Sequence, residues 1–218
     1  MKKTLLVLSL SLITFLGFGQ NDSALKLALM AHPNIGFIKA ENGKGGGQSL
    51  GFIYGLASDF EFSDNYSFST GLLVTTVNGR SSIINFYPYH DTSSGTPAFY
   101  DVKYMMQYLE IPLALKLKTD EVGDLSWYGK FGFTADLRLG AKQTVESGGN
   151  LLAEKVKASN NTRFFRAGLL IGAGAKYKIF GNTSLTGGLS YNNGMSDIAK
   201  KGSKVKNHFI NIDFGIVF

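Results

Sequence analysis

The last twelve residues, NHFINIDFGIVF from Asn207 to Phe218, decide the fold class of this chain. From the first isoleucine of this stretch onward, every second residue is large and apolar, and most residues between them are small or polar. Side chains alternate between the two faces of a β-strand, so a period of two residues indicates a strand with unlike faces. The stretch therefore predicts a strand whose apolar face carries Ile210, Ile212, Phe214, Ile216 and Phe218.

The same period of two recurs in seven segments upstream, and no helical period is sustained in the chain. Eight alternating segments match the even strand number of transmembrane barrels. We therefore predict an all-β fold: an eight-stranded antiparallel up-and-down transmembrane β-barrel. Its strands are expected at Lys26–Lys39, Ser49–Phe62, Tyr66–Asn78, Tyr100–Lys118, Trp127–Lys142, Arg163–Ile179, Thr183–Asn193 and Asn207–Phe218.

The connections between these segments alternate in length. Three are short, at residues 63–65, 119–126 and 180–182, and four are longer, at residues 40–48, 79–99, 143–162 and 194–206. Outer-membrane barrels have short periplasmic turns and longer outer loops, so the alternation places both termini in the periplasm. The glycine run Gly43–Gly47 falls in a predicted loop, and we interpret it as flexible rather than as a phosphate-binding motif.

The N-terminus reads as a secretory signal. Met1-Lys2-Lys3 is basic, Thr4–Phe18 is almost wholly apolar, and small residues precede a cut after Gly19. We predict a cleaved signal peptide at residues 1–19 and an outer-membrane β-barrel domain at residues 20–218, with a cut after Gln20 left open. The rest of the chain has no apolar run of about 18 residues that could form a spanning helix.

Composition excludes several classes of protein. The chain has no Cys, which excludes a disulfide scaffold, a zinc ribbon and a thiol nucleophile. Without Lys2 and Lys3 it carries 20 basic and 16 acidic residues, and this mild excess gives no indication of a nucleic-acid partner. The 27 glycines fall mainly in the loops and on the polar faces, as expected where a narrow lumen leaves little room. We expect no cofactor and no bound metal.

Alternation alone does not say which way the apolar face points. It points at lipid in a membrane barrel and inward in a soluble lipocalin-like carrier. The terminal Phe218, in register with the apolar face, resembles the sorting signal read by the outer-membrane assembly machinery. We therefore interpret the five apolar residues of the last strand as a C-terminal insertion signal and the barrel-assembly machinery as its partner.

Aromatic residues also favour the membrane. They gather near strand ends at two levels, as expected for girdles at the two membrane interfaces. The level near the short turns comprises Phe60, Phe62, Tyr66, Phe68, Trp127, Tyr128, Tyr177, Phe180 and Phe218. The level near the long loops comprises Tyr100, Tyr104, Phe164, Phe165, Tyr191 and Phe209. The chain is thus expected in the outer membrane of a Gram-negative bacterium, in contact with its lipid and lipopolysaccharide.

The polar faces carry opposite charges. Glu110, Asp136, Arg138, Arg166 and Asp213 fall near mid-strand on the face that would point inward. One interpretation is a proton or ion path, and the other is a structural network of ion pairs that plugs a narrow barrel. We favour the structural network, because eight strands enclose an interior that side chains fill.

Few residues suggest catalysis or ligand binding. An outer-leaflet enzyme acting on lipid A would need a Ser–His pair, and the only histidines are His32, His90 and His208. No motif supports such a pair, so we predict no enzymatic activity. A lysine-rich loop at residues 200–206 could hold lipopolysaccharide phosphates or simply be solvated, and an aromatic loop at residues 83–90 could meet a protein partner.

The stretch Tyr108-Leu109-Glu110-Ile111-Pro112-Leu113-Ala114-Leu115-Lys116 resembles the PorT-like outer-membrane β-barrel family of Bacteroidota. The resemblance covers the mature chain, although only this stretch is specific. It implies an integral outer-membrane protein, and one branch of the family takes part in type IX secretion. No catalytic residue is implied. Because Pro112 lacks a donor for the strand ladder, we also predict a β-bulge at this position.

These observations together predict a monomeric barrel with a plugged polar lumen and a structural or partner-binding role, the partner being met through the outer loops or the periplasmic turns. Three alternatives stay open. They are an accessory component of a type IX-like secretion assembly, an outer-leaflet lipid-modifying enzyme and a soluble lipocalin-like carrier.

Overall fold

The computed structural model describes residues 25–86, 89, 97–200 and 204–218. The predicted signal peptide, His90 and Lys201 lie outside these residues. Nine strands are present in the described part: β1 (Leu25–Ala40), β2 (Gly43–Ser63), β3 (Tyr66–Ile84), β4 (Phe99–Lys118), β5 (Leu125–Ser147), β6 (Asn150–Lys157), β7 (Phe165–Phe180), β8 (Thr183–Gly194) and β9 (Val205–Val217). Within the described ranges, no helix is long and apolar enough to cross a membrane.

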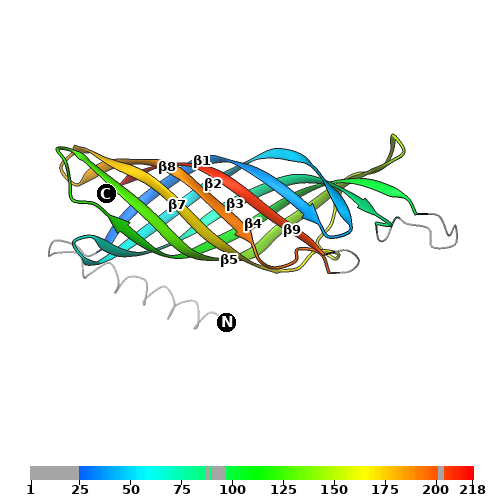
Figure 1. Ribbon diagram of the computed structural model, residues 1–218, viewed down its shortest axis with the longest axis horizontal. Coiled ribbons are helices and arrows are strands. Elements are labelled where there is room, and N and C mark those ends of the chain that lie inside the picture. The colour runs from blue at the N-terminus through cyan, green and yellow to red at the C-terminus, as the bar shows by residue number, and fades with distance from the viewer. Residues whose placement is uncertain (1–24, 87–88, 90–96, 201–203) are drawn as a thin grey trace, which may run out of the picture.

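Eight of these strands close into a ring (Figure 1). Their order is β4-β3-β2-β1-β9-β8-β7-β5, and β4 pairs with β5 to complete the circle. Each pairing is antiparallel, as in the β1–β9 and β4–β5 ladders. The eight ring strands are the eight that the alternation predicts, so the predicted fold class is confirmed. The first described residue and the C-terminal residue both lie at the end of the barrel with the short β2–β3, β4–β5 and β7–β8 connections, which we call the turn end.

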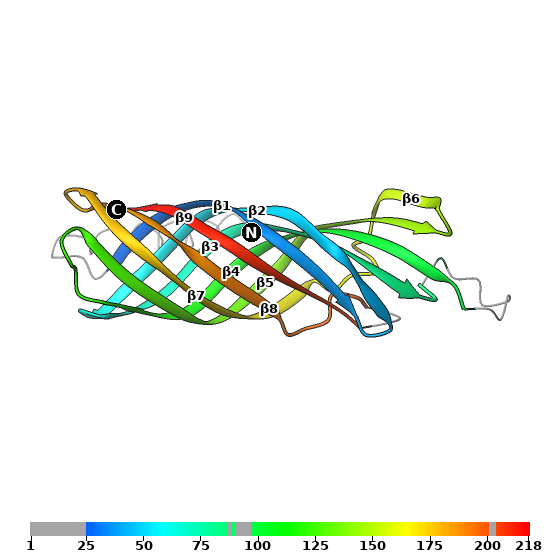
Figure 2. The same ribbon diagram turned by 45° about the horizontal axis from the view of Figure 1, so that its top comes forward.

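The opposite end, the loop end, is taller than the sequence predicts (Figure 2). β2 starts six residues earlier than expected and β3 ends six residues later, so only Glu41 and Asn42 separate β1 from β2. β5 continues to Ser147 and turns into β6, which pairs with β5 alone. Part of the predicted loop at residues 143–162 is therefore a β-hairpin that rises beyond the ring. The predicted alternation of short and long connections fails at β1–β2, because the early start of β2 makes that connection short.

The glycine run is part of the extended wall rather than a flexible loop. Gly43 and Gly45 pair with Ile83 and Ser81 of β3, because backbone hydrogen bonds need no side chain. A Cβ atom added to Gly46 would lie 2.8 Å from backbone atoms of Arg80 and Ser81. The absence of side chains thus lets the two strands approach closely, with a register shift between Gly45 and Gln48.

The predicted bulge at Pro112 is wrong. Pro112 pairs with Thr134 of β5 in an unbroken register, and the irregularity lies at Gln107/Tyr108. On the other side, the β3–β4 pairing runs to Ser69↔Ala114 and resumes at Leu73↔Glu110 without a change of register. The β3–β4 ladder therefore has a gap around Pro112, which lacks an N–H donor, and β4 needs no bulge residue there.

The outer surface carries a belt of apolar side chains, the lipid band, which spans Leu109–Leu117 on β4 and Ile210–Phe218, the last residue of which directly follows β9. Nine residues on each strand agree with the roughly 9 to 11 residues that a tilted strand needs to cross a bilayer. Ile210, Ile212, Phe214 and Phe218 are 38–58% exposed on this surface, and Ile216 is half-buried. The apolar face of the last strand therefore points outward, as a membrane barrel requires.

Above the lipid band, apolar side chains change sides. On β4 the outward residues become Asp101, Lys103 and Gln107, while inward residues become apolar. Fully buried side chains fill the loop end of the lumen, and we call this set the apolar plug: Ile38, Val77, Ile83, Val102, Tyr104, Met106, Val145, Val205 and Phe209. Ile198, from the β8–β9 connection, packs against it. The wall that stands in water thus has the pattern of a soluble barrel.

The inward-facing residues correct two predictions. The lumen is not polar along its whole length, because its loop-end part is apolar. Four aromatic residues expected in the girdles instead face inward with 1–7% exposure: Tyr100, Tyr104, Tyr128 and Phe209. The other aromatics at the turn end are on the outside, from Phe68 at 40% to Phe180 at 85% exposure.

Candidate functional site

A chain of charged residues crosses the middle of the lumen in register. Glu110 of β4 lies opposite Asp136 of β5, which lies opposite Arg166 of β7. All three are at most 3% exposed. A buried carboxylate needs a charged partner, and the guanidinium beside Asp136 supplies one.

Arg166 is the centre of this mid-lumen network. It forms an ion pair with the Asp136 carboxylate and donates to Asn192 Oδ1 at 2.7 Å. It also donates to the carbonyl oxygen of Asn207 at 3.1 Å and to its side-chain oxygen. Its guanidinium lies 5.1 Å from the ring centre of Phe209, at the lower face of the apolar plug. Arg166 therefore ties β5, β7, β8 and β9 together across the interior.

Glu110 has a partner of its own. Thr75 of β3 donates its hydroxyl to Glu110 Oε2 at 2.9 Å, with both side chains buried. Asn192, which accepts from Arg166, donates its Nδ2 to Thr134 Oγ1 at 3.0 Å. Buried polar groups stay stable only when hydrogen-bonded, and these contacts extend the network to most of the ring.

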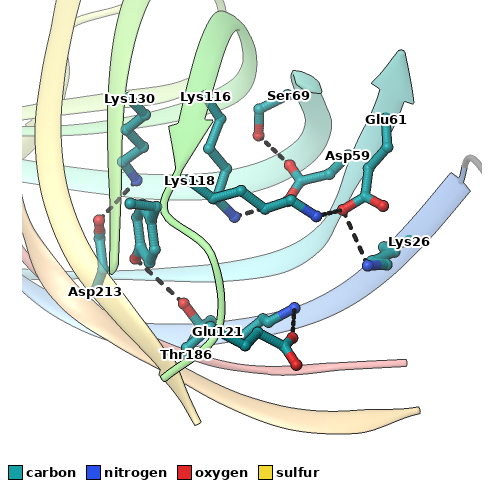
Figure 3. Close-up of polar contacts among 12 residues, drawn as sticks. Lys26, Asp59, Glu61, Ser69, Lys116, Lys118, Glu121, Lys130, Thr186 and Asp213 are labelled. Atoms are coloured by element: carbon teal, nitrogen blue, oxygen red, sulfur yellow. Dashed lines mark hydrogen bonds and ion pairs between the residues drawn. The ribbon is translucent and has the colours of Figure 1, made fainter. Parts of the chain in front are cut away.

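Asp213 forms a second centre, nearer the turn end (Figure 3). Lys130 Nζ lies 2.6 Å from Asp213 Oδ2, as Figure 3 shows. Ser190 Oγ donates to Asp213 Oδ1 at 3.0 Å. His32 Nε2 lies 3.5 Å from the same Oδ1. Because Ser190 is bonded to Asp213 rather than to His32, the arrangement is not that of a serine nucleophile and its histidine base.

The turn-end opening of the lumen is lined by ion pairs, which we call the mouth cluster (Figure 3). Glu61 lies 2.7 Å from Lys118 and 3.0 Å from Lys26, measured between Nζ and Oε1. Asp59 lies 2.7 Å from Lys116 and accepts a 2.6 Å hydrogen bond from Ser69. Lysines and carboxylates thus neutralise one another across β1, β2, β3 and β4, as in a structural closure.

Arg138 is the one predicted lumen residue that joins neither centre. It is half-buried and its guanidinium reaches the β6–β7 connection, where it donates to Thr162 Oγ1 at 2.7 Å and to the Arg163 carbonyl oxygen at 3.3 Å. Arg138 therefore fastens a loop at the loop end, and the structure does not bring it to the other four residues.

Two small cavities lie in the lumen formed by the described residues. One of about 70 Å³ extends from Glu110 past His32 and Asp213 to Asp59 of the mouth cluster. A second, of about 20 Å³, lies at the mouth cluster. The buried atoms His32 Nδ1 and Asn211 Oδ1 lack a hydrogen-bond partner among the described residues. These cavities suit a few water molecules rather than a substrate.

Metal coordination has no candidate within the described ranges: three or more His, Cys, Asp or Glu side chains nowhere gather there in a ligating cluster. His208, which the enzyme alternative would use, lies on the outer surface and stacks on Tyr191 with ring centres 6.5 Å apart.

Several network residues were not singled out in the sequence, notably Thr75, Lys130, Asn192 and Asn207. Each lies on the inward face of its strand, and Lys130 and Asn207 share that face with a predicted lumen charge, whereas the strands of Thr75 and Asn192 carry none. Reading the whole inward face, rather than its charged residues alone, would have found them. The pairing of Asp136 with Arg166 and of Asp213 with Lys130 depends on register across strands, which alternation does not supply.

The family comparison agrees with this architecture. Residues 10–200 match the family model described as an outer membrane protein beta-barrel domain. No curated protein matches the chain. Similar solved structures include Neisserial surface protein A, at 14% identity and a TM-score of 0.46, covering 89% of this chain and 96% of that one. They also include Ail of Yersinia pestis, at 16% identity and a TM-score of 0.40, covering 88% and 98%.

OprG of Pseudomonas aeruginosa is similar at 14% identity and a TM-score of 0.44, with 91% of this chain and 98% of that chain covered. The family match spans most of the sequence, and the closed ring with its lipid band has the form that such a domain requires. The chain therefore belongs to the outer membrane protein beta-barrel domain family and is a barrel of the Gram-negative outer membrane.

Proposed function

We propose that this protein is a non-conducting barrel that anchors a protein-binding wall outside the membrane. The observation that carries the proposal is the height of the wall. β2, β3, β4 and β5 continue beyond the lipid band, and the β5–β6 hairpin extends beyond the ring (Figure 2). A barrel that only had to sit in the membrane would need roughly half the 20 residues of β4.

The hairpin offers a means of binding a protein. β6 pairs with β5 on one side and is the last strand in the sheet order, so its other edge is open. Leu151 and Leu152 on this strand are 54% and 47% exposed. An open edge with exposed apolar side chains is a template for addition of a partner strand.

The interior supports a structural rather than a transport role. The apolar plug, the mid-lumen network and the mouth cluster occupy successive levels of the lumen. In planar lipid bilayers we therefore expect the purified chain to insert without opening channels, measured as the absence of conductance steps. Reproducible steps from the folded wild-type chain would refute the non-conducting part of the proposal.

Partner binding is tested by photo-crosslinking in intact cells. A photoreactive residue at Leu151 should yield a discrete protein adduct. The same residue at Leu189, which is 59% exposed within the lipid band, is the matched control and should yield none. Equal adducts from both sites, or none from Leu151, would contradict the proposed binding wall.

A second candidate function is an accessory role in a type IX-like secretion assembly. The Tyr108–Lys116 stretch supports a PorT-like relationship, and the open β6 edge favours a protein partner over a small molecule. We propose no catalytic activity in either case, because Ser190 is engaged by Asp213 and the cavity beside His32 is too small for a lipid chain.

A further inference from the structure

A basic groove lies on the outside of the barrel, just above the lipid band. It is bounded by β1, β8 and β9, which are neighbours in the ring (Figure 1). The groove has a volume of about 560 Å³, and its lining includes Lys39, Lys204, Lys206, His208, Glu41 and Met195. Lys204 and Lys206 belong to the lysine-rich loop for which lipopolysaccharide phosphates are one expected ligand, and the proposed function uses none of the groove residues.

The charges in this groove are unbalanced. Lys39 of β1 and Lys206 of β9 are direct partners across the ladder. Like charges in this arrangement are destabilising. Among the described residues, neither lysine has a carboxylate within ion-pair distance, whereas Lys204 Nζ is 3.6 Å from Glu41 Oε2 with both side chains exposed. Three lysines therefore meet one carboxylate, and an anion held between Lys39 and Lys206 would remove their repulsion.

An apolar groove lies directly below the basic one. It has a volume of about 280 Å³ and lies on the lipid band between β7, β8 and β9, lined by Ile171, Leu189, Tyr191 and Ile210 among others. The pair Tyr191↔Ile210 is only two residues along the ladder from Asn193↔His208, which lines the basic groove. Two residues of strand span about 7 Å. The ring of Tyr191 stacks on His208, so one aromatic pair joins the two grooves.

We propose that this face binds a phosphorylated lipid of the outer leaflet. Its phosphate would lie between Lys39 and Lys206, and an acyl chain would fill the apolar groove beneath. An anion directly above an apolar groove, both at the level of the membrane surface, matches the layout of such a lipid. A soluble acidic protein would use the cations but leave the lower groove facing bulk lipid.

The test uses the full chain folded in detergent micelles and native mass spectrometry to measure lipid retained per chain. The probes are bis-phosphorylated lipid A, the same lipid stripped of its phosphates, and inorganic phosphate. We expect the phosphorylated lipid to bind and the stripped lipid to bind far less. Millimolar inorganic phosphate should fail to displace the bound lipid, because it cannot occupy the apolar groove.

Two variants and a control separate the site from general charge. Lys39→Gln with Lys206→Gln should weaken binding about thirtyfold, taking the usual contribution of two lysines at an anionic surface. Leu189→Trp should weaken it by filling the apolar groove. The control is Lys142→Gln with Lys157→Gln, which removes another directly opposed and exposed lysine pair at the loop end, on β5 and β6. That control should bind as the wild type does.

Three results would overturn the proposal: equal binding of the stripped lipid, equal loss in the control pair, or displacement of the lipid by inorganic phosphate. The last would show an anion site without a lipid. Because all substituted side chains point outward, folding is checked by the gel shift between heated and unheated samples. The comparison of probes on the wild-type chain stands even if a variant fails to fold.

Discussion

Replacing Arg166 with Met should destabilise the barrel strongly. The change removes an ion pair with Asp136 and the hydrogen bonds to Asn192 and Asn207, all in a site where Arg166 is 1% exposed. Asp136 would then lie directly opposite Glu110 without a neighbouring cation. Breaking a buried pair in this way typically costs about 3 to 5 kcal/mol.

The assay is urea unfolding of the chain folded into lipid vesicles. Trp127 is the only tryptophan in the sequence and is 59% exposed on the outer wall, so its fluorescence reports whether the barrel is in lipid. With a typical slope of about 1 to 3 kcal/mol per molar urea, the midpoint should fall by roughly 1 to 5 M. The gel shift on heating gives an independent measure of the folded fraction.

A second variant identifies the cause. Arg166→Met combined with Asp136→Asn removes the unpaired charge along with its partner, so the double variant should recover a large part of the lost stability. A loss below about 1 kcal/mol in Arg166→Met would show that the network contributes little. A double variant no better than the single one would show that the loss arises from packing around Arg166 and not from the stranded carboxylate.

The remaining predictions concern packing, insertion and lipid contact. Gly174→Ala should lower stability by about 1 to 3 kcal/mol, because the new Cβ would lie 2.5 Å from Tyr128 Oη and 2.3 Å from the Gly187 carbonyl oxygen. Gly129→Ala should not lower it, because no atom lies nearer than 4.0 Å to the new Cβ. The urea midpoints of the two variants give the comparison. Phe218→Ser should reduce the folded, heat-modifiable fraction in cells, whereas Phe180→Ser, at a more exposed aromatic, should leave it unchanged; equal effects would remove the special role of the last residue. Phe214→Lys, in the middle of the lipid band on β9, should lower the free energy of unfolding in vesicles by about 2 to 4 kcal/mol. Gln107→Lys, above the band, should lower it by almost nothing. Similar urea midpoints for both variants would show that the lipid band is assigned to the wrong level of the barrel.

The sequence predicts the ring well because each lipid-facing strand repeats one simple constraint. From Ile210 to Phe218, or from Leu109 to Leu117, every second side chain contacts lipid, and the period is visible without any partner strand. It predicts the interior less well. Asp136 and Arg166 belong to different strands, and only the register brings them together. Arg138 sits on the same face two residues from Asp136 and yet contacts a loop.

The loop end was harder still. Val74 faces outward and Val77 faces inward on the same strand, so the apolar alternation changes phase where β3 leaves the lipid band. A phase change looks like the end of a strand when only one environment is assumed, which explains the predicted end at Asn78. The glycines at Gly43–Gly47 carry no alternation at all, so nothing in their sequence distinguishes a paired strand from a loop.

The charged outer face above the lipid band has a consequence for how the barrel sits. Arg80, Asp101, Lys103, Lys142 and Glu146 point outward there. Moving the barrel toward its turn end would carry several of these charged side chains into the hydrocarbon. A Lys or Arg there costs up to about 2 to 4 kcal/mol, the value at the midplane. Moving it the other way would expose the isoleucines and phenylalanines of β9 to water. The barrel therefore has one depth of insertion, and the height of the β5–β6 hairpin above the cell surface is set by the strands themselves.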